Sequence, residues 1–178
     1  VTAEEANMLQ RYAQDSRLGI PLLIGIDAIH GNALVRGATV YPAPMSMAST
    51  WNLDLVRRAN EETAIEMRAT GSHWSFTPNI DIARDPRWGR VGETFGEDSY
   101  LVGEMGVATI DGLQQGDFDG PTKVIANAKH WVAGGDPING INLSPMDISI
   151  RTLREDFFPP FKRAIDAGVF TFMPAHNE

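Results

Sequence analysis

The stretch that decides the fold covers residues 79–98 and reads NIDIARDPRWGRVGETFGED. It holds three arginines and five carboxylates, and it directly follows the apolar, β-prone run WSFT at residues 74–77. In parallel α/β proteins, polar residues that follow the end of a buried strand are where the functional site is built. The stretch therefore predicts such a fold, with a site at this strand end. A salt-bridged loop that only ties a strand to a helix is the alternative.

The residue types in this stretch suit a ligand rich in hydroxyl groups. Arg84, Arg87 and Arg90 offer directional hydrogen bonds beside the carboxylates, and Trp88 offers a flat apolar face. A hydrogen bond to a charged group contributes roughly 1.5–3 kcal/mol, and a carboxylate next to a guanidinium can hold vicinal hydroxyls of a sugar.

Strand and helix patterns alternate along the chain. Apolar runs predict strands at residues 22–27, 74–80, 123–128 and 168–173. Helical spacing predicts helices at about 52–70, from 98 or 99 to 112, and after a capping box at Thr152-Leu-Arg-Glu155, the last one kinked early by Pro159 and Pro160. This order predicts parallel β/α units, and four of them are about half of a (β/α)8 barrel of the TIM type. A doubly wound sheet is the alternative.

Polar residues recur where the predicted strands end. Asp27 ends the first strand, and the arginine-rich stretch follows the second. Lys129 and His130 follow the third strand, and His176 follows the fourth. In a (β/α) barrel all these ends share one face, which favours the barrel over a sheet with a single switch point. A capping or ion-pair role is the alternative for Asp27 and for the Lys129-His130 pair.

Composition excludes several classes of function. A net charge of −8 with no Lys/Arg block longer than a pair gives no support for nucleic-acid binding. The chain has no cysteine, which excludes disulfides and cysteine-ligated zinc. No apolar run approaches the roughly 20 residues of a membrane span. The chain starts at Val1 without a signal-peptide pattern, and we expect it to be part of a longer protein.

Common catalytic motifs are missing from the chain. Neither GxGxxG nor GxxxxGK[ST] occurs, so nucleotide binding lacks its usual loop. The four histidines lie on separate elements with no HExxH, and no Gly-x-Ser-x-Gly elbow is present. Paired carboxylates are the usual groups for glycoside cleavage, but the pattern alone does not select a pair.

Five motifs follow one another along essentially the whole chain. They are Gly25-Ile-Asp-Ala-Ile-His-Gly31, Asp81-Ile-Ala-Arg-Asp-Pro-Arg-Trp-Gly-Arg90, Glu93 with Phe95-Gly-Glu-Asp98, Ala128-Lys-His130, and Asp147-Ile-Ser-Ile-Arg-Thr-Leu-Arg-Glu155 with Pro159-Pro-Phe161. Taken together and in this order, they resemble the amino-terminal barrel of glycoside hydrolase family 3, most of all that of bacterial periplasmic or secreted β-glucosidases.

This resemblance implies roles for particular residues. Asp27, Arg90, Lys129 and His130 would bind the hydroxyls of the terminal, non-reducing sugar in subsite −1, and Glu93 would support them from behind. Asp85 and Arg87 would hold the loop. His176, in Met173-Pro-Ala-His-Asn-Glu178, stands where the family has an aromatic residue beside the nucleophile, so we expect it near the bound sugar. The resemblance implies no metal or organic cofactor.

Two departures from the family pattern bear on the activity. Lys129-His-Trp-Val-Ala-Gly-Gly135 differs from the Lys-His-Phe-Pro-Gly-His-Gly pattern of the N-acetylglucosaminidase branch, which argues against that branch. The family's nucleophile, an aspartate in Ser/Thr-Asp-Trp, and its acid/base, usually a glutamate in a following domain, are not found in residues 1–178.

The resemblance thus implies a β-glucosidase-like enzyme in which this chain supplies sugar-binding residues but no catalytic residue. We expect the chain alone to be inactive. Its partners would be a β-glucoside or oligosaccharide substrate, the remainder of its own barrel and a second domain. A periplasmic or secreted location follows from the same resemblance. A non-catalytic carbohydrate-binding relative is one alternative, and another exo-β-hexosidase or β-xylosidase of the family is a second.

Overall fold

Four short parallel strands form the centre of the fold. The computed structural model describes residues 2–116 and 120–177. In it β1 (Gly25–Ile26) pairs with β2 (Trp74–Ser75), and β3 (Asn127–Trp131) pairs with β4 (Thr171–Pro174). Isolated parallel bridges, from Trp74 to Ile125 and from Asn79 to Lys129, join the two pairs. The strands therefore run side by side in chain order, as the alternating pattern predicted.

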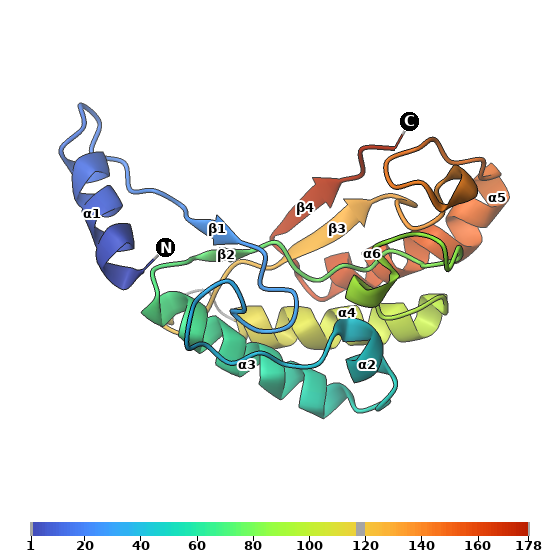
Figure 1. The fold of residues 1–178 in the computed structure, drawn as a ribbon, viewed down its shortest axis with the longest axis horizontal. Coiled ribbons are helices and arrows are strands. Elements are labelled where there is room, and N and C mark those ends of the chain that lie inside the picture. Colours follow the sequence, from blue (N-terminus) through green and yellow to red (C-terminus); the bar gives the residue numbers. More distant parts are fainter. Residues whose placement is uncertain (1, 117–119, 178) are drawn as a thin grey trace.

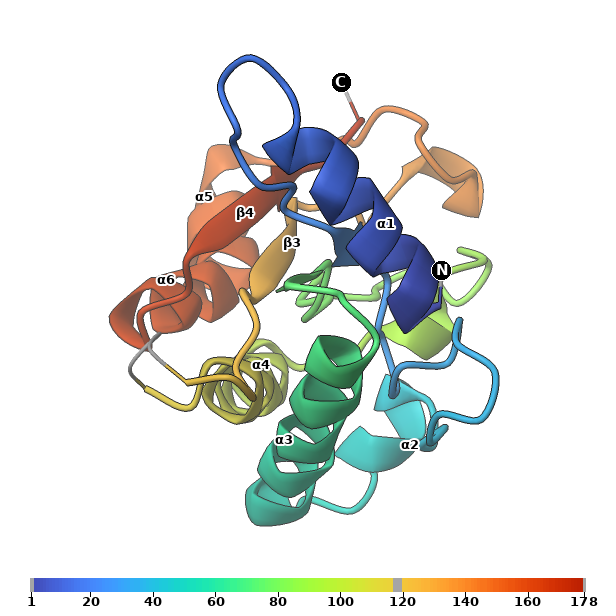
Figure 2. The ribbon, with the colours of Figure 1, turned by 90° about the vertical axis from the view of Figure 1, so that its left-hand side faces the viewer.

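Three helices cover one face of these strands. They are α3 (Leu53–Ala69), α4 (Ser99–Gln114) and α6 (Phe158–Asp166), and α4 packs against both of the others (Figures 1 and 2). The core lies between them and the strands, with Met67, Met105, Ile110 and Phe161 almost completely buried. Burying each such side chain stabilises the fold by roughly 1.5–3 kcal/mol.

Helices α3 and α4 begin where the sequence predicted, each with a side-chain cap. The Asn52 side chain accepts a hydrogen bond from the Leu55 N–H, and the Asp98 side chain accepts one from the Leu101 N–H. Each cap satisfies a backbone donor that the first turn leaves without a partner, which fixes where the helix begins. Helix α3 buries the apolar face that its spacing indicated, including Val56 and Met67.

The first strand is shorter than predicted because the residues before it pair with a helix. Helix α1 (Ala3–Gln14) precedes the sheet and stands beside it (Figure 1). The Gln10 side chain bonds both the N–H and the C=O of Leu22, at 2.9 and 2.8 Å. Leu22 and Leu23 are exposed. The backbone groups of Leu22 that Gln10 binds do not enter the sheet, and β1 is limited to Gly25 and Ile26.

The third strand lies further along the chain than predicted. The Val124 N–H bonds the carbonyl of Leu113, and the Ala126 N–H bonds the side chain of Gln114, so this segment is tied to the end of α4. Pairing with β4 starts at Asn127. As a correction, Lys129 and His130 therefore lie within a strand rather than after it.

The last helical segment begins earlier than the predicted capping box. Ser149, not Thr152, is the N-cap, and its side chain accepts the Thr152 N–H at 3.1 Å. From there α5 (Ile150–Thr152), a π-helical turn (Leu153–Phe157) and α6 follow without a break. Among the elements that were not predicted are the helix α1, the short helix α2 (Pro44–Ala48) and the 3₁₀ turns Val91–Glu93 and Ile138–Gly140.

Candidate sugar-binding site

Asp27 and Lys129 form an ion pair between two strands. Asp27 directly follows β1, and its Oδ1 lies 2.8 Å from the Nζ of Lys129 in β3. The Lys129 side chain is 3% exposed, whereas that of Asp27 is 50% exposed. A buried ammonium without a carboxylate partner is strongly destabilising, so Asp27 neutralises Lys129. The exposed part of Asp27 leaves its carboxylate further room to accept hydrogen bonds.

Arg90 and Glu93 face each other across the 3₁₀ turn. The Arg90 Nε lies 2.5 Å from Glu93 Oε1, and its Nη2 lies 2.9 Å from Oε2, which is the two-point geometry typical of a strong pair. The Asn79 amide approaches the same carboxylate at 3.5 Å. Both side chains are partly buried. The pair holds the guanidinium in a fixed orientation at the end of β2.

The pKa values of Arg90 and Glu93 depend on each other and on the charges of neighbouring side chains. The hydrogen bonds that Arg90 donates to Glu93 raise the pKa of Arg90 against the opposing effect of burial, and the charges of Glu93, Asp81 and Asp27 add to this rise. For Glu93, burial acts to raise the pKa, but hydrogen bonds from Arg90 and the charges of Arg90 and Lys129 hold the pKa below its usual range. Asp27, Lys129 and Arg90 are therefore close enough to interact.

His130 pairs with a buried aspartate. Its Nδ1 lies 2.7 Å from Oδ2 of Asp81, and both side chains are buried. His130 also lines a small pocket of about 20 Å³, which holds about one water molecule. Several of the predicted site residues meet in this pocket, whose wall includes Trp88, Arg90, His130, Asn142, His176 and Asn177.

The structure thus brings the predicted site residues together in two groups. Arg90, His130 and the exposed His176 share the small pocket, with Glu93 held by Arg90. Asp27 and Lys129 form the neighbouring ion pair and do not line that pocket. Sequence reasoning missed the Asp81–His130 pair, since nothing in the pattern links residues that lie far apart in the chain.

Trp88 differs from its predicted role. It is 2% exposed, and its Nε1–H donates to the Asn142 side chain at 2.9 Å, so it fixes a loop rather than offering a flat face. The exposed aromatic next to His130 is Trp131, which is 42% exposed and stacks on Phe158. Asp85 and Arg87 form a local pair, as their loop-holding role predicted, and the Arg87 side chain is mostly exposed.

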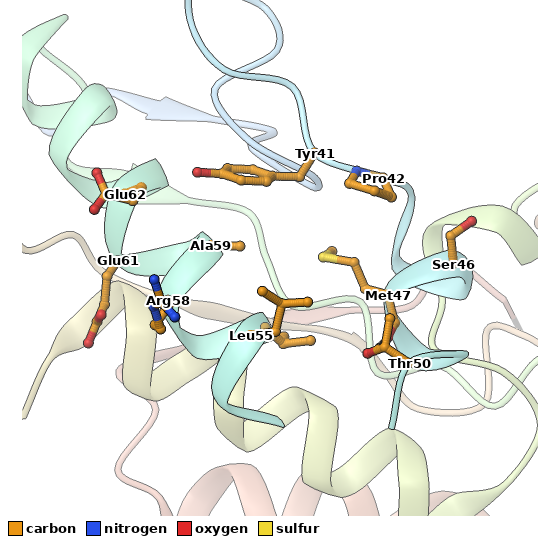
Figure 3. Close-up of a pocket in the computed structure, with 11 residues that line it drawn as sticks. Tyr41, Pro42, Ser46, Met47, Thr50, Leu55, Arg58, Ala59, Glu61 and Glu62 are labelled. Carbon is orange, nitrogen blue, oxygen red and sulfur yellow. Dashed lines mark hydrogen bonds between the residues drawn. The ribbon is translucent and has the colours of Figure 1, made fainter. Parts of the chain in front are cut away.

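A separate, apolar pocket lies between α2 and α3. Tyr41 and Met47 face Leu55 and Ala59 of α3 across it (Figure 3). Burial raises the pKa of Tyr41, and the charges of Glu62 and Glu66 act in the same direction. This pocket contains none of the predicted site residues. Within residues 2–116 and 120–177, no three acidic or histidine side chains are grouped to hold a metal ion.

The comparisons with known proteins identify the family. The model of the glycosyl hydrolase family 3 N-terminal domain matches residues 1–178. The chain belongs to glycosyl hydrolase family 3. The resemblance drawn from the sequence motifs is confirmed. The family 3 N-terminal domain and its solved relatives are of the TIM-barrel type, which agrees with the parallel strands in chain order.

Family 3 relatives of known name are glycosidases. A β-xylosidase of Formosa agariphila is 44% identical over 97% of this chain, and a periplasmic β-glucosidase of Salmonella typhimurium is 35% identical over 99%. Among solved structures, a β-glucosidase of saponin metabolism from intestinal bacteria gives a TM-score of 0.96 at 40% identity over 100% of the chain. A Listeria innocua β-glucosidase with laminaribiose gives 0.92 at 36% over 99%.

The chain spans about a quarter of the length of these family 3 proteins: 25% and 23% of the two curated relatives, and 24% of each of the two structures. Within the described part of the chain, no helix is both long enough and apolar enough to cross a bilayer.

Proposed function

We propose that this chain is the sugar-binding part of an exo-acting, retaining β-glucosidase-like enzyme. The observation that carries the proposal is a set of polar side chains in or after neighbouring parallel strands, each held by the side chain of another residue. Lys129 is held by Asp27, and Arg90 is held by Glu93. His130 is held by Asp81. Donors and acceptors fixed in this way suit the several hydroxyls of one sugar ring.

In subsite −1 of the complete enzyme, Asp27 accepts hydrogen bonds from hydroxyls while Lys129 and Arg90 donate them. Glu93 holds Arg90, and His176 borders the same pocket. These contacts accelerate the reaction to the extent that they strengthen as the sugar ring flattens in the transition state.

The bond-breaking residues belong to the rest of the enzyme. One carboxylate attacks the anomeric carbon, and a second carboxyl group protonates the leaving oxygen, the two standing about 5–5.5 Å apart in a retaining enzyme. The remaining strands close the sheet into a barrel, and a second domain completes the site. Export to the periplasm or beyond is part of the proposal, supported by the relative named as a periplasmic β-glucosidase.

A β-xylosidase is the second candidate, because the Formosa agariphila relative at 44% identity carries that name. A xyloside differs from a glucoside by lacking the hydroxymethyl group on the ring. The ratio of kcat/KM for nitrophenyl β-glucoside to that for nitrophenyl β-xyloside, measured on the full-length protein, separates the two.

The proposal is tested with two arginines of one loop. Arg90→Lys keeps the charge but loses the two-point contact with Glu93, whereas Arg87→Lys makes the same change in the exposed pair with Asp85. In the full-length protein we expect kcat/KM on the better substrate to fall about 30- to 1,000-fold for Arg90→Lys and to stay near the parent value for Arg87→Lys. Equal kcat/KM for the two variants, or a parent without turnover on either glycoside, contradicts the proposal.

A further inference from the structure

We propose that Asp81 is a positioning residue for His130: it holds the hydrogen of the imidazole on Nδ1, so that Nε2 offers a lone pair to a sugar hydroxyl in the pocket. This inference rests on the proposed function, since it assigns a chemical role to one of the sugar-binding residues.

The carboxylate beside the ring indicates which ring nitrogen carries the hydrogen. Asp81 Oδ2 lies 2.7 Å from His130 Nδ1, a normal hydrogen-bond distance. An ionised carboxylate only accepts hydrogen bonds, so Nδ1 is the donor. In the neutral ring the other nitrogen, Nε2, is then an acceptor. The structure gives Nε2 no partner among the described residues, and His130 lines the small pocket.

The surroundings of Asp81 keep the pair in place and dry. The Asp81 side chain is fully buried, and its backbone N–H donates to the Asn79 side chain at 3.0 Å. Two glycines close over it. A Cβ on Gly134 would lie 3.1 Å from Asp81 Oδ1, and one on Gly135 would lie 2.4 Å from the carbonyl oxygen of Ile82. Side chains at these positions would displace the loop that covers the carboxylate.

Burial of Asp81 is expensive, which argues for more than a role in stability. Its Oδ1 is buried and has no hydrogen-bond partner in the described part of the chain. Burying an oxygen without a hydrogen-bond partner lowers stability, and more so when the oxygen is charged. A carboxylate that orients an imidazole from behind has a known chemical use, because it sets the tautomer and the angle of the ring.

An acceptor at Nε2 complements the other side chains of the site. Lys129 and Arg90 are obligate donors, so the oxygens of a hydroxylated ligand accept from them. A hydroxyl that accepts in this way still has its own hydrogen to donate, and the lone pair of Nε2 is positioned to receive it. The opposite tautomer would present a third donor to the same hydroxyl groups.

The tautomer is measured directly in the parent protein. Histidine-selective ¹⁵N labelling of the full-length protein, with the His130 signals assigned by their loss in His130→Ala, distinguishes the protonated from the unprotonated ring nitrogen. We expect the hydrogen on Nδ1 and a lone pair on Nε2. A His130 with its hydrogen on Nε2 overturns the proposal, whatever the behaviour of any variant.

The functional consequence is tested with a double-mutant cycle. Asp81→Asn removes the obligate acceptor, and we expect kcat/KM to fall about 10- to 100-fold. In a His130→Ala background the same change should have almost no further effect, because Asp81 acts through His130. A full loss in both backgrounds overturns the proposal. The control Asp111→Asn removes a carboxylate from the outer helix α4 and should leave kcat/KM unchanged.

A third measurement separates failure of this inference from failure of the proposed function. If the parent hydrolyses neither aryl glycoside, the proposed function is wrong, but the ¹⁵N spectrum still decides the tautomer. Calorimetric titration with glucose adds a binding readout, and Asp81→Asn should weaken glucose binding about 10- to 100-fold. Unchanged activity and unchanged glucose binding in a folded Asp81→Asn overturn the inference and leave the proposed function standing.

Discussion

At the scale of single residues, the candidate site contains an ion pair in which one partner is buried and the other is exposed to solvent. Lys129 is almost fully buried, and Asp27, on a different strand, is half exposed. The same carboxylate therefore serves two purposes: it neutralises the ammonium, and it keeps acceptor capacity toward the solvent. Mutations at such a residue affect stability and ligand binding together.

Asp27→Asn tests this dual role. In the full-length enzyme we expect kcat/KM on an aryl β-glycoside to fall about 30- to 1,000-fold, which corresponds to a loss of roughly 2–4 kcal/mol in transition-state stabilisation. The reason is that the amide replaces one hydrogen-bond acceptor by a donor. Unfolding free energy should also fall by about 1–2 kcal/mol, since buried Lys129 loses its charged partner. Kinetics and thermal melting measure the two effects.

The control for Asp27→Asn is Asp166→Asn. Asp166 pairs with Lys162 on the surface of α6, where both side chains are mostly exposed, so its loss should change the unfolding free energy by less than about 0.5 kcal/mol. Normal kinetics combined with a sharply lowered melting temperature in Asp27→Asn would show that the carboxylate has only a structural role.

The Arg90–Glu93 pair predicts a dependence of stability on pH. Since the pKa of Glu93 is lower in the folded protein than in the unfolded chain, the pair stabilises the fold above the usual glutamate pKa. This contribution is lost as the pH falls through the lowered pKa. Glu93→Gln should therefore lower the melting temperature at pH 7 and have less effect at an acidic pH below the lowered pKa of Glu93. An equal difference at both pH values would contradict the assignment.

At the scale of elements, α3 and α4 approach so closely that a glycine is required between them. A Cβ on Gly112 of α4 would lie 2.3 Å from the carbonyl oxygen of Arg57 and 2.7 Å from the Cβ of Asn60, both in α3. Gly103 of the same helix differs, because its Cβ would meet the flexible side chain of Arg163 at 2.6 Å. Backbone does not move aside as a side chain does.

Gly112→Ala and Gly103→Ala form a matched pair. Alanine favours a helix over glycine by about 1 kcal/mol at either position. We expect a net loss of about 1–3 kcal/mol in unfolding free energy for Gly112→Ala, because the two helices must move apart. Gly103→Ala should cost at least about 1 kcal/mol less. Urea unfolding compares the two variants, and equal losses would show that the helix contact can adjust.

Sequence patterns predicted the presence of the main helices and strands better than the residues at which they begin and end. Caps at Asn52 and Asp98 were predictable because a side chain and a backbone N–H three residues apart suffice to form them. The limits of β1 and β3 were not, since Gln10 and the end of α4 take up backbone groups that the apolar pattern assigns to the sheet. Contacts between distant segments leave no mark in local periodicity.

For the candidate site, the residues themselves were predictable from the sequence, but the contacts between them were not. Asp27, Arg90, Lys129 and His130 were predicted from their places at strand ends and from the family motifs. Their pairing was not predicted. That Asp81 holds His130, and that Trp88 is buried against Asn142, follows from how loops fold over the strands. Residue type and spacing do not determine such contacts.

At the scale of the whole molecule, two partly exposed aromatic side chains lie at the β3–β4 side of the sheet. Trp131 of β3 and Phe172 of β4 contact each other and remain 42% and 38% exposed. In the proposed enzyme, further strands and helices cover this edge. The proposed sugar-binding residues lie in this chain, whereas the family's nucleophile and acid/base motifs are not found in it.

We therefore expect no hydrolysis by the isolated 178-residue chain. The measurement is release of nitrophenol from an aryl β-glucoside by the purified chain, beside the full-length protein at equal concentration. Turnover near an ordinary enzyme's 1–10³ s⁻¹ by the isolated chain would mean that the catalytic residues lie within it.

The chain order of the strands also bears on how the protein is made. Each strand pairs with the one synthesised just before it, at separations of roughly 50 residues, so the sheet can grow as the chain leaves the ribosome. If the sheet grows in this way, the protease protection of ribosome-bound chains should rise stepwise as the chains become longer. Asp27 is half exposed and is synthesised 102 residues before Lys129, which is almost fully buried. The carboxylate that neutralises Lys129 is therefore available when the ammonium group becomes buried.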